Sequence, residues 1–130
     1  MTKTKLYVGV RGRFGAKVAV HYEGTIKALR KRLDLFNHSP TGFEWGYAGS
    51  GPAQLSLALL ADALGDDKEA LRLHQDFKFA VITGLPRNSW KLTREEVLGL
   101  VVELQARRQA RGVPKGCNDP IKGEIDAPDE

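Results

Sequence analysis

The sequence has little of what disulfide-stabilised, membrane-spanning or exported proteins require. Cys117 is its only cysteine, which excludes an internal disulfide. The longest apolar run, residues 55–64, is interrupted by Ser56 and Asp62, and it is far shorter than the roughly 20 residues that span a bilayer. No basic and apolar leader opens the chain. We therefore expect a cytoplasmic protein that makes no membrane contact.

Residue patterns typical of metal and catalytic sites are also missing. His21, His38 and His74 are scattered along the chain, and no cysteine pair completes a zinc site around them. Ser39 follows His38, but no Gly-x-Ser-x-Gly elbow surrounds it, so local bonding in a turn is expected instead. We expect no metal, no cofactor and no enzymatic activity. An enzyme would require Glu44 or His38 to converge with the Trp45 loop on a pocket.

Length and composition are those of one small globular domain. The chain has 130 residues, of which 42% are hydrophobic and 28% charged. From Gly112 onward, Pro, Gly, Asn and Asp largely replace apolar residues. We expect a single α+β domain over residues 1–115 and an acidic, mobile tail over residues 116–130.

Alternating apolar and polar residues predict β-structure near the start of the chain. Residues 6–11 and 17–22 both alternate, and the glycines of residues 12–16 indicate the turn of a hairpin. Residues 25–36 fit a helical stripe and also one face of a strand, and we favour an extended third strand. The expected N-terminal unit is an antiparallel hairpin or a three-stranded meander.

Helical periodicity dominates the remainder of the chain. Apolar spacing predicts helices over about residues 52–64, 67–83 and 94–110, with a short extended piece at residues 90–92. These helices are expected to cover the N-terminal strands, which gives an α+β fold.

Polar residues at the helix starts predict capping. Ser50 is placed to cap the first helix, and the pairs Asp66 with Glu69 and Thr93 with Glu96 have capping-box spacing. These acids therefore have a structural explanation that requires no catalytic chemistry.

Positive charge is concentrated in the first third of the chain. Residues 1–33 hold nine Lys or Arg and one acid, whereas residues 34–115 are neutral and residues 116–130 carry a net charge of −4. Cationic side chains attract phosphates and acidic protein surfaces. We predict an outward-facing contact surface that combines these cations with aromatic residues. Its members are Arg11, Arg13, Phe14, Lys17, Arg30, Lys31, Arg32, Trp45 and Tyr47.

The most informative stretch is GFEWGYAGSGPAQL at residues 42–55, which places four glycines and three aromatics ahead of an apolar helix. Together with other segments of residues 38–78, it resembles a bacterial family described only as a domain of unknown function. Members of that family are small proteins often found on phages, plasmids and integrated elements. The resemblance implies accessory or anti-defence roles and implies no catalytic residues.

Three hypotheses follow. The first is a non-enzymatic binding protein of a mobile element that inhibits or modulates a host nucleic-acid-handling complex, such as an anti-CRISPR-type inhibitor. Its partner is a host protein or ribonucleoprotein complex. The second is an accessory protein that binds nucleic acid directly, and the third is an enzyme.

Overall fold

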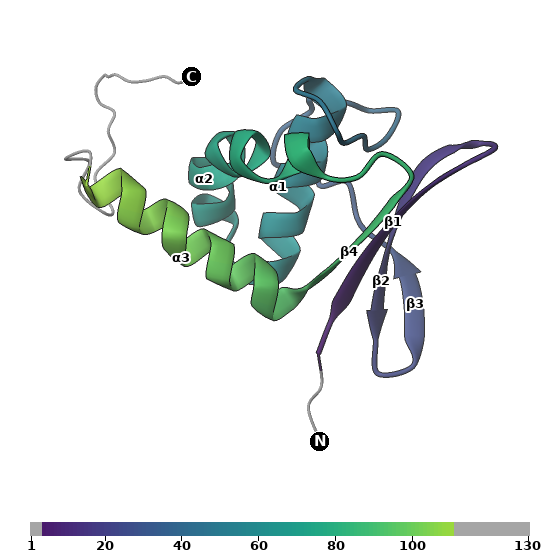
Figure 1. Cartoon of the computed structure of the whole chain (residues 1–130), viewed down its shortest axis with the longest axis horizontal. Helices are drawn as coiled ribbons and strands as arrows, with labels where there is room; N and C mark the ends of the chain where they lie inside the picture. The colour runs from purple at the N-terminus through teal and green to yellow at the C-terminus, as the bar shows by residue number, and fades with distance from the viewer. Residues whose placement is uncertain (1–3, 111–130) are drawn as a thin grey trace.

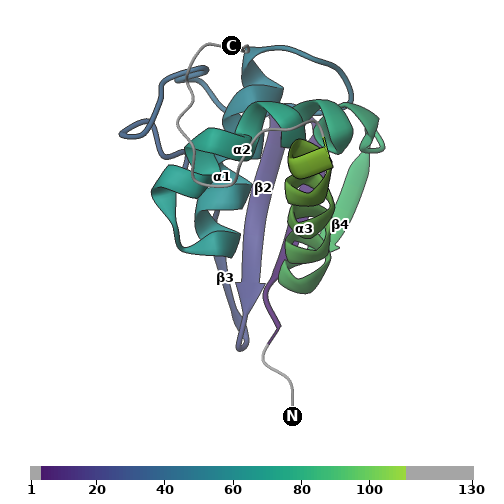
Figure 2. The ribbon, with the colours of Figure 1, turned by 90° about the vertical axis from the view of Figure 1, so that its left-hand side faces the viewer.

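The computed structural model describes residues 4–110, which form an α+β domain with one sheet and three helices on one side of it (Figures 1 and 2). The predicted fold class is confirmed. The proposed tail at residues 116–130 and Cys117 lie outside the described residues. The elements in chain order are β1 (Leu6–Gly12), β2 (Gly15–Tyr22), β3 (Thr25–Ala28), α1 (Ser50–Leu64), α2 (Asp67–Ala80), the 3₁₀ turn η1 (Ile82–Gly84), β4 (Ser89–Thr93) and α3 (Arg94–Ala110).

The sheet is antiparallel, with the strand order β3-β2-β1-β4. Its first three strands confirm the predicted meander, although β3 covers only the start of the ambiguous range 25–36. The short extended piece expected at residues 90–92 belongs to the longer strand β4, which pairs with β1. The predicted meander thus has a fourth strand supplied by the region just before α3.

A close approach of backbone and side chain brings β4 against β1. Gly9 lies opposite Trp90 in the register, and a Cβ atom added at Gly9 would lie 2.3 Å from the Trp90 indole. Only glycine leaves room for the ring to cross the strand there. Trp90 is consequently buried beneath the helices, at 5% exposure.

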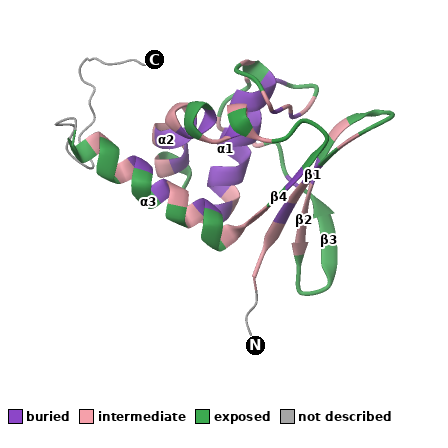
Figure 3. Cartoon of the chain, in the orientation of Figure 1, coloured by how far each residue is buried: buried purple, intermediate pink, exposed green. Residues whose placement is uncertain are grey.

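Helix α1 forms the centre of the domain and lies between α2 and the sheet (Figure 1). Twelve of its fifteen residues are buried, and Figure 3 shows it as the most continuously buried element. Each fully buried leucine contributes about 1.5–3 kcal/mol of hydrophobic stabilisation. The surrounding helices and strands therefore derive much of their stability from contact with this one helix.

A buried polar link joins β1 to the same helix. The Tyr7 hydroxyl donates a hydrogen bond of 2.6 Å to the Asp62 carboxylate, and Lys5 forms a salt bridge of 3.1 Å with Asp62. Burial, reinforced by the bonded carboxylate, raises the pKa of the Tyr7 phenol well above its usual range. Tyr7 consequently stays protonated and remains a donor.

Two predicted helix starts are confirmed and one is not. The Asp66 carboxylate accepts from the backbone N–H of Glu69, and Thr93 and Glu96 exchange both bonds of a capping box. The prediction for Ser50 was wrong, because α1 already includes this residue and no side chain caps it. The second predicted helix also ends early, with η1 replacing its last turn.

Gln54 organises the long irregular segment between β3 and α1, residues 29–49. Its buried side-chain amide makes four hydrogen bonds to the backbone of this segment. Oε1 accepts from the N–H groups of His38 and Ser39, and Nε2 donates to the carbonyls of Lys31 and Phe36. The Gln54 side chain thus satisfies four backbone groups of a segment that forms no regular secondary structure.

None of the helices within residues 4–110 has the length and apolar character needed to cross a membrane.

Candidate partner-binding surface

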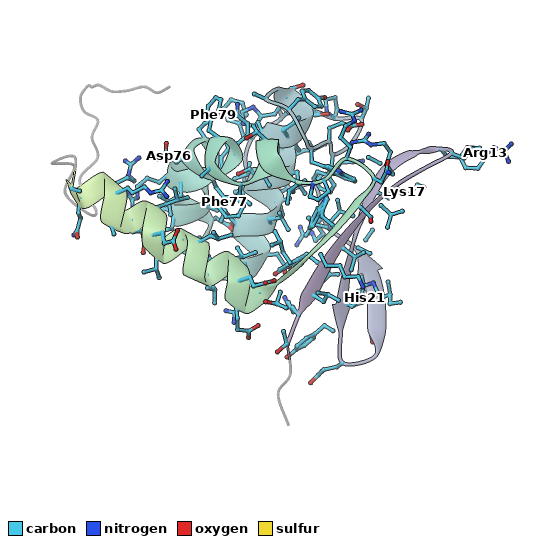
Figure 4. All side chains as sticks on the ribbon, in the orientation of Figure 1. Arg13, Lys17, His21, Asp76, Phe77 and Phe79 are labelled. Atoms are coloured by element: carbon cyan, nitrogen blue, oxygen red, sulfur yellow. The ribbon has the colours of Figure 1, made fainter. Side chains whose placement is uncertain are left out.

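The β1–β2 hairpin projects beyond the rest of the domain (Figure 1). Gly12 pairs with Gly15, which leaves Arg13 and Phe14 as the two loop residues, and Gly15 takes a positive φ of 107° to return the chain into β2. Phe14 is 87% exposed, and Arg13 lies at the extreme tip (Figure 4). An arginine and a solvent-exposed phenyl ring are therefore presented together.

No element within residues 4–110 covers the outer face of the sheet, defined as the face away from the helices. Tyr7 points toward α1, so strand alternation places its direct neighbours on the opposite side. In strand order, the outer-face residues are Ile26 and Ala28; Lys17, Ala19 and His21; Leu6, Val8 and Val10; and Ser89, Lys91 and Thr93.

This outer face combines an apolar centre with positive charge. Val10 is 50% exposed and lies beside Lys17, while Val8 lies beside Lys91. The four strands place no aspartate or glutamate on this face. Within residues 4–110, the side chains of Arg13, Lys17 and Lys91 form no hydrogen bond or ion pair. The hairpin and the outer face thus form one continuous cationic surface.

Arg11 and Trp45 face inward, in contrast to the predicted outward-facing set. Trp45 is fully buried, and its ring packs edge-on against Trp90 at a centroid distance of 5.6 Å. The Arg11 guanidinium lies 4.9 Å from the Trp45 ring centroid and 2.8 Å from a Glu44 carboxylate oxygen. Trp45 Nε1 and Arg11 Nε both donate to the carbonyl of Arg87. Trp45 is therefore a core residue, and the Arg11 guanidinium packs against its ring.

Arg32 is also engaged within the protein. Its guanidinium forms paired hydrogen bonds of 2.9–3.2 Å with the carboxylates of Asp34 and Asp67. Those two acids raise the pKa of Arg32, and the Arg32 guanidinium in turn lowers the pKa of Asp34. Arg32 thus ties the irregular segment to the start of α2, and its charge is already neutralised.

Three remaining predicted residues keep exposed positions. Arg30 and Lys31 are exposed in the irregular segment, and Tyr47 is 46% exposed with its ring close to Gly49. The structure therefore places Arg13, Phe14, Lys17 and these three at the surface. Sequence reasoning missed Lys91, although its alternation with the flanking Trp90 and Leu92 was a usable signal.

A second feature missing from the sequence analysis is the contact between His38 and His74. Their Nε2 atoms lie 3.0 Å apart. His74 Nδ1 lies 2.7 Å from the Leu71 carbonyl, so this nitrogen carries a hydrogen and Nε2 accepts from His38. Burial lowers the pKa of both imidazoles, and the Lys78 ammonium adds to the effect. The pair is consequently most stable with both rings neutral.

We predict that the free energy of unfolding falls as the pH is lowered below about 6.5, the ordinary histidine pKa. Below this pH the two histidines bind protons in the unfolded chain but stay neutral in the folded protein. Protonation therefore favours unfolding until the pH reaches the lower pKa values of the folded state. Urea denaturation at about pH 7.5, 6.5 and 5.5, values that bracket the ordinary histidine pKa, measures this dependence. The double variant His38→Gln/His74→Gln should flatten the profile, and an unchanged slope would contradict the assignment.

Glu44 and His38, either of which an enzyme would need in a pocket with the Trp45 loop, are engaged elsewhere: Glu44 pairs with Arg11, and His38 contacts His74. Ser39 donates its hydroxyl to the carbonyl of Gly42, which confirms the expected local turn bonding.

Residues 4–110 thus form an α+β domain in which the helices pack on one face of the sheet and leave its other face open. A model of the family of unknown function DUF6166 matches residues 7–103, and the chain belongs to this family. The predicted resemblance to a family of unknown function is confirmed to that extent. Searches of curated proteins and of solved structures found no match.

Proposed function

We propose that this chain is a non-enzymatic binding protein that occupies a surface of a host nucleic-acid-handling complex. The observation that carries the proposal is the projecting hairpin, where Arg13 and the 87% exposed Phe14 lie together. Exposed aromatic and arginine side chains are the residue types that dominate binding energy at protein interfaces. Lys17 and Lys91 extend the positive charge onto the outer face, where a partner with acidic side chains or phosphates gains complementary contacts.

The proposed role is inhibition or modulation of that complex, as an anti-CRISPR-type inhibitor encoded on a phage or another mobile element. Its support is the resemblance carried by residues 42–55 together with the small size of the domain. Such a protein acts by covering a surface and requires no reaction of its own. The contact set is Arg13, Phe14, Lys17, Arg30, Lys31, Tyr47 and Lys91, in the cytoplasm of the host.

Direct nucleic-acid binding is a second candidate. The pairing of Arg13 with Phe14 favours it, because a cation and a free aromatic face together contact phosphate and base. Binding of this kind weakens steeply with salt, with a logarithmic slope of about −0.9 per phosphate contacted on duplex DNA.

Charge reversal at the hairpin tests the proposal. We expect Arg13→Glu/Lys17→Glu to weaken binding to the host complex at least about tenfold, which corresponds to about 1.4 kcal/mol. The matched control Arg107→Glu/Lys68→Glu reverses two exposed cations on α3 and α2, and it should bind as the wild type does. The measurement is affinity purification from host extract with mass spectrometry, followed by titration of the purified partner.

Equal retention of the same host proteins by wild type and hairpin variant would exclude the hairpin as the contact. Gel shifts at low salt with single-stranded and duplex DNA separate the two candidates. Loss of a DNA shift in the hairpin variant alone would favour direct nucleic-acid binding, whereas no shift with wild type would leave only the protein partner.

A further inference from the structure

A second candidate surface is formed by the irregular segment and α2. We call it the aromatic-basic surface, and its residues are Phe36, His38, His74, Lys78 and Phe79. Phe79 is far from Arg13 in Figure 4. Contacts link its members in sequence: Phe36 stacks on His38, His38 meets His74, Lys78 lies one turn further along α2, and its ammonium meets Phe79.

The two phenyl rings at its ends are open to solvent. Phe36 is 53% exposed and Phe79 is 61% exposed, so neither ring contributes much to the core. Phe36 and His38 stack at a centroid distance of 4.2 Å with an interplanar angle of 25°. This leaves the other face of Phe36 free to extend the stack by one more planar ring.

Lys78 gives this surface a positive charge that no acid of residues 4–110 pairs with. The residue is only 9% exposed, and its ammonium lies 4.2 Å from the Phe79 ring centroid. Within the described residues no carboxylate bonds to it. Asp76, an acid of α2 whose charge acts on the pKa of His74, is bonded to Arg108 at 3.0 Å. A partly desolvated cation without a counter-ion favours an anionic ligand.

We infer that the aromatic-basic surface binds single-stranded nucleic acid, with bases stacking on Phe36 and Phe79 and a phosphate facing Lys78. Planar bases match the open ring faces, and the phosphate supplies the missing counter-ion. A duplex keeps its bases stacked inside and cannot reach the rings, whereas an acidic peptide satisfies the charge but not the ring faces. This site is separate from the hairpin, and the inference does not depend on the function proposed for the hairpin.

The test is fluorescence anisotropy with a labelled oligothymidylate of about 12 nucleotides, at low salt. We expect Phe36→Ala/Phe79→Ala to weaken binding about tenfold or more, since stacking of each base is lost. Lys78→Gln should weaken it and reduce the salt dependence. The control Val102→Ala removes an exposed apolar group on α3 and should bind like wild type, as should Arg13→Glu/Lys17→Glu.

Lowering the pH from about 7.5 to 6, across the ordinary histidine pKa, adds a readout that a folding defect would not produce. A nearby phosphate favours the charged imidazoles, so oligothymidylate binding should strengthen in the wild type and change less in His38→Gln. Circular dichroism checks that each variant is folded.

Three results would overturn the inference. They are no binding of oligothymidylate by wild type, equal binding by the double phenylalanine variant, and displacement by polyglutamate as effective as displacement by unlabelled oligothymidylate. Loss of oligothymidylate binding only in Arg13→Glu/Lys17→Glu would also overturn it, because the nucleic acid would then bind the hairpin and not this surface.

Discussion

Replacing Gln54 with leucine should lower the free energy of unfolding by about 4 kcal/mol, at about 1 kcal/mol or more for each of the four hydrogen bonds lost. The apolar side chain fills similar space but leaves two N–H groups and two carbonyls of the irregular segment without partners. Removing one side of a hydrogen bond leaves the desolvation cost of the other side uncompensated. Chemical denaturation measures the loss.

Two matched variants separate hydrogen bonding from other effects. Gln54→Glu retains an oxygen that accepts from His38 and Ser39, but it sets a second oxygen against the carbonyls of Lys31 and Phe36. Because the site is fully buried, the added charge should make the loss at neutral pH at least as large as that of Gln54→Leu. Gln109→Leu makes the same substitution at an exposed position of α3 and should change stability by less than about 0.5 kcal/mol. If Gln54→Leu were as stable as Gln109→Leu, the segment would have to be held by other contacts.

Replacing Trp45 with alanine is expected to reduce the free energy of unfolding by about 3–5 kcal/mol, as is usual for a fully buried aromatic residue. The substitution leaves a cavity beside Trp90 and removes the aromatic face beneath the Arg11 guanidinium. Trp45→Phe retains an aromatic ring but loses the hydrogen bond to the Arg87 carbonyl, and about 1 kcal/mol of loss is expected. Thermal and urea unfolding monitored by circular dichroism check both values.

Trp45→Ala also distinguishes the structural role of Trp45 from the sequence-based hypothesis that Trp45 contacts a partner. A surface residue replaced by alanine leaves the free energy of unfolding within about 0.5 kcal/mol of wild type and affects binding alone. Such a result for Trp45→Ala would be incompatible with its 0% exposure.

Local patterns were sufficient to predict most of the elements. Alternation identified β1 and β2, helical spacing identified the helices, and the spacings of Asp66 with Glu69 and of Thr93 with Glu96 identified two caps. These features depend on neighbours within a few residues, and sequence displays such neighbours directly.

Features that depend on distant contacts were not accessible in this way. Pairing of β4 with β1 joins residues that are far apart in the chain, and the His38 contact with His74 spans 36 residues. The inward orientation of Arg11 depends on Glu44 and Trp45 arriving beside it. Gln54 did carry a signal, because the single amide side chain of a mostly apolar helix requires buried partners.

The one-sided arrangement of the sheet has a consequence for how this family can diversify. Alternate residues of β1 lie on different faces of the sheet. Tyr7 and Gly9 pack toward the interior, whereas Val8 and Val10 lie on the outer face. Substitutions at the latter positions alter the chemistry of the outer face and leave the residues that pack against the helices unchanged. Under the proposed function, a change of binding partner would then require only a few substitutions on the sheet and no repacking of the helices.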